Sequence, residues 1–198
     1  MISPHLQAWS RRAIERIVRP LARTGIDPNA LTIAGLLISI VTAVVIGAGW
    51  LVPGGVLVLL TGGFDTVDGA VARLNGSRST FGAFLDSTLD RWAEGAIFTG
   101  LIWHLMSIDA QLEAVLAITA LIGSVLISYT RARAEGLGIA CNVGFFQRPE
   151  RLIVLGISLL GPFALLTATL AFLALVTQLT AVQRVLHVYR EIERAKQT

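Results

Sequence analysis

The chain has 198 residues, enough for one domain, and only 15% of them are charged whereas 54% are hydrophobic. A soluble domain usually carries about 25% charged residues, so this composition argues against a soluble protein and indicates a membrane protein. The formal net charge of +3 does not predict nucleic-acid binding, because the positions of the basic residues explain it better.

Residues 1–29 lack the compact apolar core of a signal peptide. Leu6, Trp9, Ile14 and Ile17 recur at helical spacing, with arginines mostly between them. This pattern predicts a juxtamembrane amphipathic helix that lies in the membrane interface. The alternative use of the same apolar face is to bind a partner helix.

The rest of the chain predicts six membrane spans, because about 20 apolar residues are needed to cross the hydrocarbon core. The first covers residues 31–50, with Asn29 and Thr32 as candidate caps at its start. The second follows a turn at Pro53-Gly54-Gly55 and runs into an Asp-rich segment. The third runs from Ser79 or Thr80 to about Met106, and the fourth covers residues 114–130.

The last two predicted spans come from one long uncharged stretch, residues 152–183. As a single helix it would measure about 48 Å, more than the ~30 Å thickness of the hydrocarbon core. We therefore divide it near Gly161-Pro162. The alternative is one long helix with a kink at Pro162.

All 16 Lys and Arg residues fall on or near one face of the six-span arrangement. The opposite connections carry only Asp109 and Glu113. Such asymmetry predicts that the basic face and both termini are cytoplasmic, in the plasma (inner) membrane. The expected domains are residues 1–28 as the juxtamembrane helix, 29–190 as the six-helix domain and 191–198 as a cytoplasmic tail.

Four aspartates, Asp65, Asp68, Asp86 and Asp90, lie in or beside predicted spans. A charge at the centre of a span costs roughly 2.5–3.5 kcal/mol on insertion scales, so these carboxylates imply partners and a function. Spacings of three and four residues put each pair on one helix face. Small residues that let two helices approach closely are Gly69, Ala72 and Gly82. Carboxylates suit Mg²⁺ or Mn²⁺, and four of them favour a site for two ions.

The pattern Asp65-x2-Asp68-Gly69-x2-Ala72-Arg73-x8-Gly82-x3-Asp86-x3-Asp90 resembles the signature of the CDP-alcohol phosphotransferases. The six-span layout with its interfacial helix is also similar to this family, so the resemblance covers nearly the whole chain. It implies an all-α integral membrane enzyme. Such an enzyme transfers the phosphatidyl group of CDP-diacylglycerol to an alcohol and releases CMP. The resemblance also suggests a homodimer.

The resemblance implies roles for individual residues. Asp65, Asp68 and Asp86 would hold the metals, and Asp90 would complete the second metal site and take the proton of the acceptor hydroxyl. The residues implied to contact the CDP-lipid are Asn29, Gly69, Ala72, Arg73, Ser79 and Gly82. Plain helix capping is the alternative for Asn29 and Ser79.

The acceptor is indicated by residues 128–135, 147–151 and 183–184, which resemble the phosphatidylinositol phosphate synthase branch. In that branch basic residues bind the phosphate of inositol 1-phosphate. The residues implied here are Arg131, Arg148, Arg151 and Arg184. Arg131 stands where those enzymes often have Lys, which keeps the charge but changes the geometry. The alternatives are that these arginines only anchor the helices, or that the acceptor is glycerol 3-phosphate.

Functions of other classes fit less well. A cation transporter would also place acidic pairs in its spans, but Arg73 and Arg91 beside the aspartates would repel cations. A structural membrane protein with a degenerate site is disfavoured because all four aspartates are present. Glu94 follows Asp90 by one helical turn, and we expect it to form a salt bridge with a basic neighbour.

Overall fold

The computed structural model describes residues 26–74, 79–144 and 146–196, apart from the side chains of residues 63–69, 72 and 73. Within these ranges the chain forms helices and no strand, which confirms the all-α prediction. The helices are α2 (Pro28–Gly47), α3 (Leu51–Leu74), α4 (Thr80–Ser107), α5 (Gln111–Glu135), α6 (Arg148–Leu160) and α7 (Phe163–Lys196). Most of the predicted amphipathic helix lies outside the described residues.

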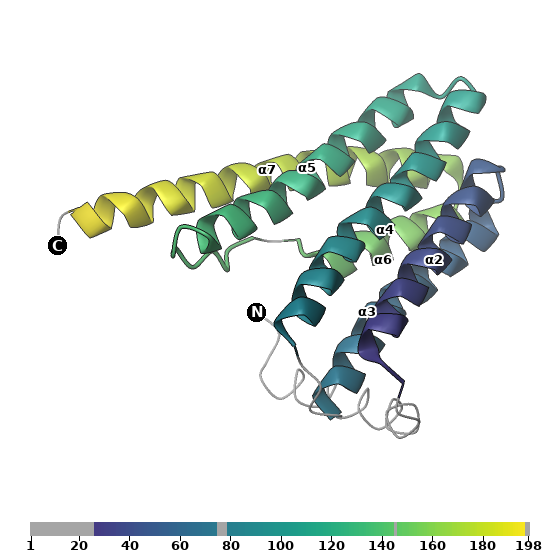
Figure 1. The fold of residues 1–198 in the computed structure, drawn as a ribbon. Coiled ribbons are helices and arrows are strands. Elements are labelled where there is room, and N and C mark those ends of the chain that lie inside the picture. Colours follow the sequence, from purple (N-terminus) through teal and green to yellow (C-terminus); the bar gives the residue numbers. More distant parts are fainter. Residues whose placement is uncertain (1–25, 75–78, 145, 197–198) are drawn as a thin grey trace, which may run out of the picture.

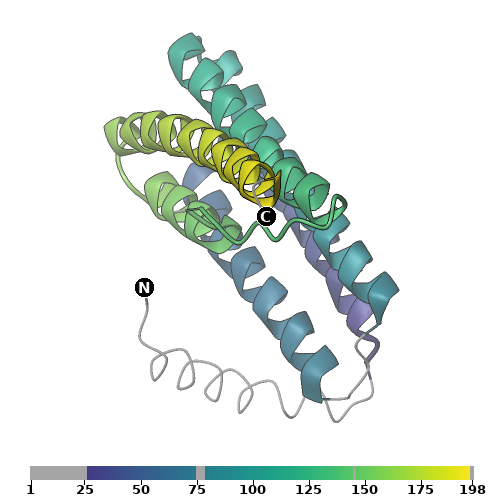
Figure 2. The ribbon, with the colours of Figure 1, turned by 90° about the vertical axis from the view of Figure 1, so that its left-hand side faces the viewer.

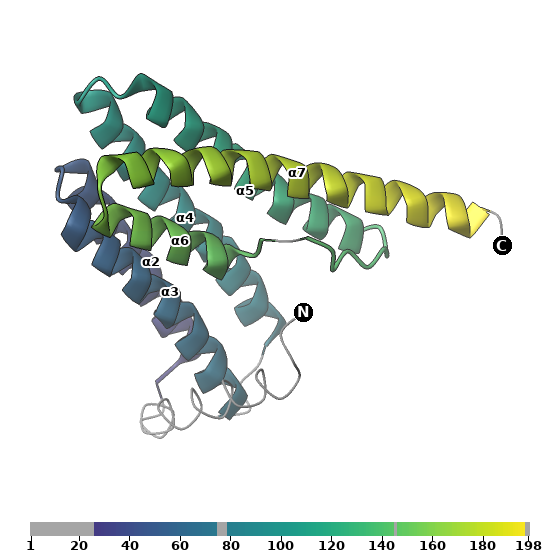
Figure 3. The same ribbon diagram turned by 180° about the vertical axis from the view of Figure 1, so that it is seen from behind.

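The helices alternate in direction along an elongated bundle (Figure 1). The starts of α2 and α4 and the ends of α3 and α5 lie toward one end, and the turns at residues 48–50, 108–110 and 161–162 lie toward the other. α2 packs against both α3 and α4, α3 packs against α6, and α5 runs along α7 (Figure 3). The C-terminal turns of α7 project beyond the other helices (Figure 1). Figure 2 shows the end of α3 and the start of α4 reaching well past α6.

Three of the described helices are long and apolar enough to cross a membrane, namely α2, α5 and α7. Their length and composition support an integral membrane protein. α4 has 28 residues but includes Asp86, Asp90, Arg91 and Glu94, which makes it less apolar. The six-span arrangement is therefore supported only in part.

Two details of the predicted spans differ from the structure. The turn expected at Pro53-Gly54-Gly55 is wrong, because α3 already begins at Leu51 and the turn before it contains Gly49 with φ of 87°. Pro53 fits there since a first helical turn does not need its missing N–H group. The break at residues 161–162 is confirmed. However, α6 has only 13 residues, about 20 Å, which is less than the core thickness of ~30 Å.

Glycines that face another helix set how closely the helices approach. A Cβ atom on Gly100 of α4 would lie 2.1 Å from the carbonyl oxygen of Ala43 in α2. A Cβ atom on Gly123 of α5 would lie 2.2 Å from Oγ1 of Thr177 in α7. Small residues of this kind are typical of helix contacts inside membranes. Leucines from three helices fill the centre of the bundle: Leu101, Leu105, Leu155, Leu159, Leu170 and Leu173.

Candidate active site

The first turns of α4 present the two carboxylates of the second aspartate pair. Ser79 is the N-cap of α4, and its Oγ accepts a hydrogen bond of 2.9 Å from the N–H group of Gly82. Asp86 and Asp90 follow Gly82 by one and two helical turns, and each is partly buried. Their spacing of four places both carboxylates on one face of the helix, as predicted.

The starts of α2 and α4 bring three of the predicted CDP-lipid residues together. A Cβ atom on Gly82 would lie 3.0 Å from Oγ of Ser79 and 3.3 Å from Oδ1 of Asn29. The prediction that Asn29 or Thr32 caps α2 is wrong, because Asp27 is the N-cap and accepts from the N–H group of Asn29 at 2.9 Å. An Asp before a proline at the first helical position is a sequence signal for that cap. The amide of Asn29 therefore lies beside the start of α4 rather than capping its own helix.

The first aspartate pair lies on α3. The backbone of Asp65, Asp68, Gly69, Ala72 and Arg73 is helical throughout, so the predicted spacing of three and four residues applies. Their side chains are outside the described part of the chain. Among the described residues no group of three or more His, Cys, Asp or Glu side chains could hold a metal ion. The four-carboxylate metal site and the nucleotide contacts on α3 stay predictions.

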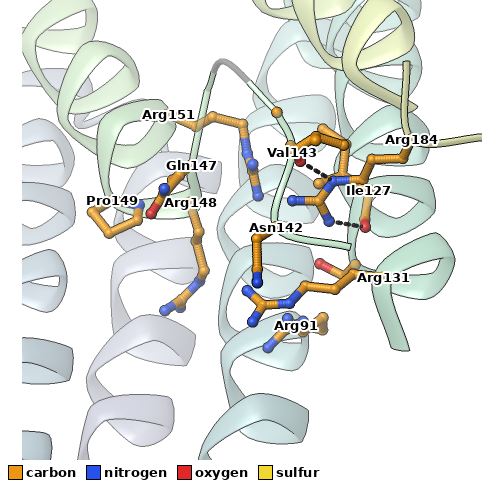
Figure 4. A pocket seen from close by; sticks show the side chains of 12 residues that line it. Arg91, Ile127, Arg131, Asn142, Val143, Gln147, Arg148, Pro149, Arg151 and Arg184 are labelled. Carbon is orange, nitrogen blue, oxygen red and sulfur yellow. Dashed lines mark hydrogen bonds between the residues drawn. The ribbon is translucent and has the colours of Figure 1, made fainter. Parts of the chain in front are cut away.

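A cavity of about 300 Å³ lies between α4, α5, α6 and α7 (Figure 4). Its walls include five arginines: Arg91, Arg131, Arg148, Arg151 and Arg184. The four arginines predicted to bind an acceptor phosphate are therefore brought to one cavity from three helices. The sequence analysis did not assign Arg91 to this group, although its position directly after Asp90 was a signal. Side chains that can only donate hydrogen bonds make the cavity suited to an anion.

Arg148 joins the cavity to the second aspartate pair. Its Nη1 atom lies 2.7 Å from Oδ1 of Asp90, and Nη1 of Arg91 lies 3.8 Å from Oδ2 of the same carboxylate. Arg91 also donates to the backbone carbonyl of Ser87. The predicted base is thus in contact with two arginines of the cavity.

Arg151 is the most constrained of the five arginines. Its Nε and Nη2 atoms donate to the two carboxylate oxygens of Glu94 at 3.1 and 3.2 Å. Nη2 also donates to Oγ of Ser124 at 2.7 Å, and Nη1 donates to the carbonyl of Phe146 at 3.1 Å. These bonds use four of the five guanidinium N–H groups. The side chains of Arg151 and Glu94 are each only 4% exposed, and the predicted salt bridge of Glu94 is confirmed.

Arg184 and Arg131 differ in how firmly they are held. Arg184 of α7 donates from Nε to the carbonyl of Val143 at 2.9 Å and from Nη1 to the carbonyl of Ile127 at 2.5 Å. It therefore ties the segment after α5 to α7 with two of its five N–H groups. Arg131 pairs with Glu135 at 2.8 Å on the exposed end of α5, where both side chains are 50% exposed. Such an exposed pair is weak, so Arg131 can exchange partners easily.

Comparisons with known proteins agree with this geometry. Residues 26–190 match the family model described as CDP-alcohol phosphatidyltransferase. The phosphatidylinositol phosphate synthase of Mycobacteroides abscessus is 42% identical over 73% of this chain and 69% of its own length. The archaetidylinositol phosphate synthase of Methanothermobacter thermautotrophicus is 33% identical over 92% of this chain and 94% of its own length.

Solved structures of the phosphatidylinositol phosphate synthase of Mycobacterium tuberculosis are also similar. With CDP-DAG bound, the TM-score is 0.82 at 34% identity, covering 90% of this chain and 94% of that one. In complex with manganese and citrate, the TM-score is 0.81 at 36% identity, covering 89% and 88%. The chain therefore belongs to the CDP-alcohol phosphatidyltransferase family.

Proposed function

We propose that this protein transfers the phosphatidyl group of CDP-diacylglycerol to a hydroxyl of inositol 1-phosphate, giving phosphatidylinositol phosphate and CMP. The observation that carries the proposal is the cavity lined by five arginines beside Asp90. Its volume of about 300 Å³ lies at the small end of ligand pockets, which suits a small anionic alcohol. The names of the two relatives differ in the lipid and share inositol phosphate, which supports this acceptor.

On the donor side, Asp65, Asp68, Asp86 and Asp90 hold two Mg²⁺ or Mn²⁺ ions in this proposal. The fit rests on the donor set, because carboxylate oxygens are the ligands that such hard cations prefer. When bound, the ions neutralise charge on the diphosphate. Arg73 contacts the nucleotide phosphates, and Gly69 and Ala72 leave room for the cytidine. Beside them, Asn29, Ser79 and Gly82 line the nucleotide side, which their proximity at the starts of α2 and α4 supports.

On the acceptor side, Asp90 accepts the proton of the attacking hydroxyl. The hydroxyl oxygen attacks the lipid-side phosphorus, and the bond from that phosphorus to the bridging oxygen breaks as CMP leaves. Arg148 pairs with Asp90 at 2.7 Å, so a guanidinium of the cavity is in direct contact with the proposed base. A phosphate in the cavity offers Arg148 a more highly charged partner, and contact with that phosphate would release Asp90 from the guanidinium to meet the acceptor hydroxyl.

The membrane arrangement in this proposal has six spans in the plasma membrane, a homodimeric assembly, and the site on the cytoplasmic face. The alternating direction of the helices supports a site at one end of the bundle, because the starts of α2 and α4 and the ends of α3 and α5 lie there. Single cysteines at Ser107 and Ser77, in a variant lacking Cys141, should react with an impermeant thiol reagent from opposite sides. Equal labelling of both from outside would contradict this arrangement.

The proposed reaction is tested by CMP release from CDP-diacylglycerol with purified protein and Mg²⁺. Inositol 1-phosphate, free inositol and glycerol 3-phosphate serve as acceptors in parallel. We expect inositol 1-phosphate to give the highest kcat/KM and free inositol to be poor, because the arginines have no anion to bind in the latter. A preference for glycerol 3-phosphate would refute the proposal that inositol 1-phosphate is the acceptor, and it would leave the family assignment intact.

A further inference from the structure

The segment between α5 and α6 forms one wall of the arginine cavity, and side chains of α6 and α7 bind its backbone carbonyls. His187 of α7 has its Nε2 atom 3.1 Å from the carbonyl oxygen of Ala140. Arg184 donates to the carbonyl of Val143 at 2.9 Å, and Arg151 donates to the carbonyl of Phe146 at 3.1 Å. Basic side chains thus bind three carbonyls of a segment that has no regular secondary structure of its own. The wall is therefore fixed in place by the same arginines that line the cavity.

Asn142 lies between two of these anchored carbonyls and lines the cavity. Its side chain is exposed and makes no hydrogen bond with any residue that the structure describes. Figure 4 shows its amide directed from the segment into the space that the arginine side chains surround. The cavity wall thus offers an amide whose position is set by its backbone and whose hydrogen bonds are open to a ligand.

The cavity needs such a group if its ligand carries hydroxyls as well as a phosphate. Arginines donate hydrogen bonds and cannot accept them, whereas a hydroxyl both donates and accepts. The arginines can therefore hold a phosphate and still leave ring hydroxyls without an acceptor. An asparagine amide supplies one acceptor and two donors at a single position. Gln147 also lines the cavity, but it is the N-cap of α6 and forms a capping box with Glu150.

We infer that Asn142 determines acceptor specificity by hydrogen-bonding ring hydroxyls of the phosphorylated cyclitol while the arginines hold its phosphate. This inference rests on the proposed function, because it assumes that the acceptor enters the arginine cavity. It predicts that Asn142 matters for a polyhydroxylated ring and little for a smaller phosphorylated alcohol. A site built to bond a substrate hydroxyl discriminates against analogues that lack it.

The test compares Asn142→Ala with the wild-type protein for inositol 1-phosphate and for glycerol 3-phosphate, following CMP release. We expect kcat/KM for inositol 1-phosphate to fall about 3- to 10-fold, the effect of one or two neutral hydrogen bonds. The KM for CDP-diacylglycerol, the kcat/KM for glycerol 3-phosphate and the melting temperature should not change. Asn142→Asp should instead lower kcat/KM for both phosphorylated acceptors about tenfold, because it adds a negative charge among the arginines.

Gln111→Ala, which removes an exposed amide at the far end of α5, is the matched control and should behave as wild type. An Asn142→Ala variant with unchanged kcat/KM for inositol 1-phosphate would overturn the inference. An equal loss with both acceptors, or a lower melting temperature with weaker binding of both substrates, would also overturn it. A wild-type protein that does not use inositol 1-phosphate would instead refute the proposed function.

Discussion

Glu94 and Arg151 should act as one energetic unit, although the two residues lie on different helices. Their side chains are 4% exposed and share two hydrogen bonds of 3.1 and 3.2 Å. Removing one partner of such a pair leaves a buried charge alone and typically costs about 3–5 kcal/mol. We therefore expect Glu94→Leu and Arg151→Met each to destabilise the folded protein by roughly that amount.

The double variant Glu94→Leu/Arg151→Met should lose much less stability than the sum of the two single variants. Replacing a whole buried pair by apolar side chains is often neutral. The double variant should therefore cost no more than either single variant, which gives a coupling energy of at least about 3 kcal/mol. The free energy of unfolding of the four proteins, measured in the same detergent by titration with SDS, gives this coupling. Acceptor KM should rise in every variant, because Arg151 also anchors the carbonyl of Phe146.

The exposed pair of Arg131 and Glu135 is the matched control. Both side chains are 50% exposed, so the same double-mutant cycle with Arg131→Met and Glu135→Gln should give a coupling of no more than about 0.5 kcal/mol. If the effects of Glu94→Leu and Arg151→Met were additive within about 0.5 kcal/mol, the view of the pair as a buried structural unit would be refuted.

Three further predictions concern the aspartates, the cavity and the helix packing. Asp86→Asn should reduce CMP release at saturating Mg²⁺ by more than about 100-fold with an unchanged melting temperature; activity within a few-fold of wild type would exclude a ligand role. Arg148→Ala should raise acceptor KM about 10- to 100-fold and leave the KM for CDP-diacylglycerol unchanged, whereas an unchanged acceptor KM would make Arg148 an anchor. Gly100→Ala should destabilise the protein by about 1–3 kcal/mol, because its Cβ would lie 2.1 Å from a backbone oxygen of α2. Gly95→Ala, whose Cβ meets nothing within 4 Å, is its control, and equal stability of the two variants would refute the packing argument.

Features that depend on neighbours along the chain could be predicted from the sequence. The spacing of Asp86 and Asp90 puts both on one helix face, and Gly161-Pro162 predicts the end of a helix. Capping of α4 was the alternative role for Ser79, and the structure has it. These outcomes follow from the helical repeat and from the backbone preferences of a few residue types. The same local rules allowed an error at the start of α3, because Pro53 is tolerated both in a turn and in a first helical turn.

The sequence alone determined the helical class, the order of the helices, the spacing of the motif and which basic residues lie at the ends of the helices around the cavity. Only the tertiary structure decided which partner each arginine has. Arg148 bonds to Asp90, Arg151 to Glu94 57 residues away, and Arg184 to Val143 41 residues away. Periodicity sets the face on which a side chain lies. It does not set which other helix meets that face, because the meeting point depends on packing between distant segments, such as the contact of Gly100 with α2.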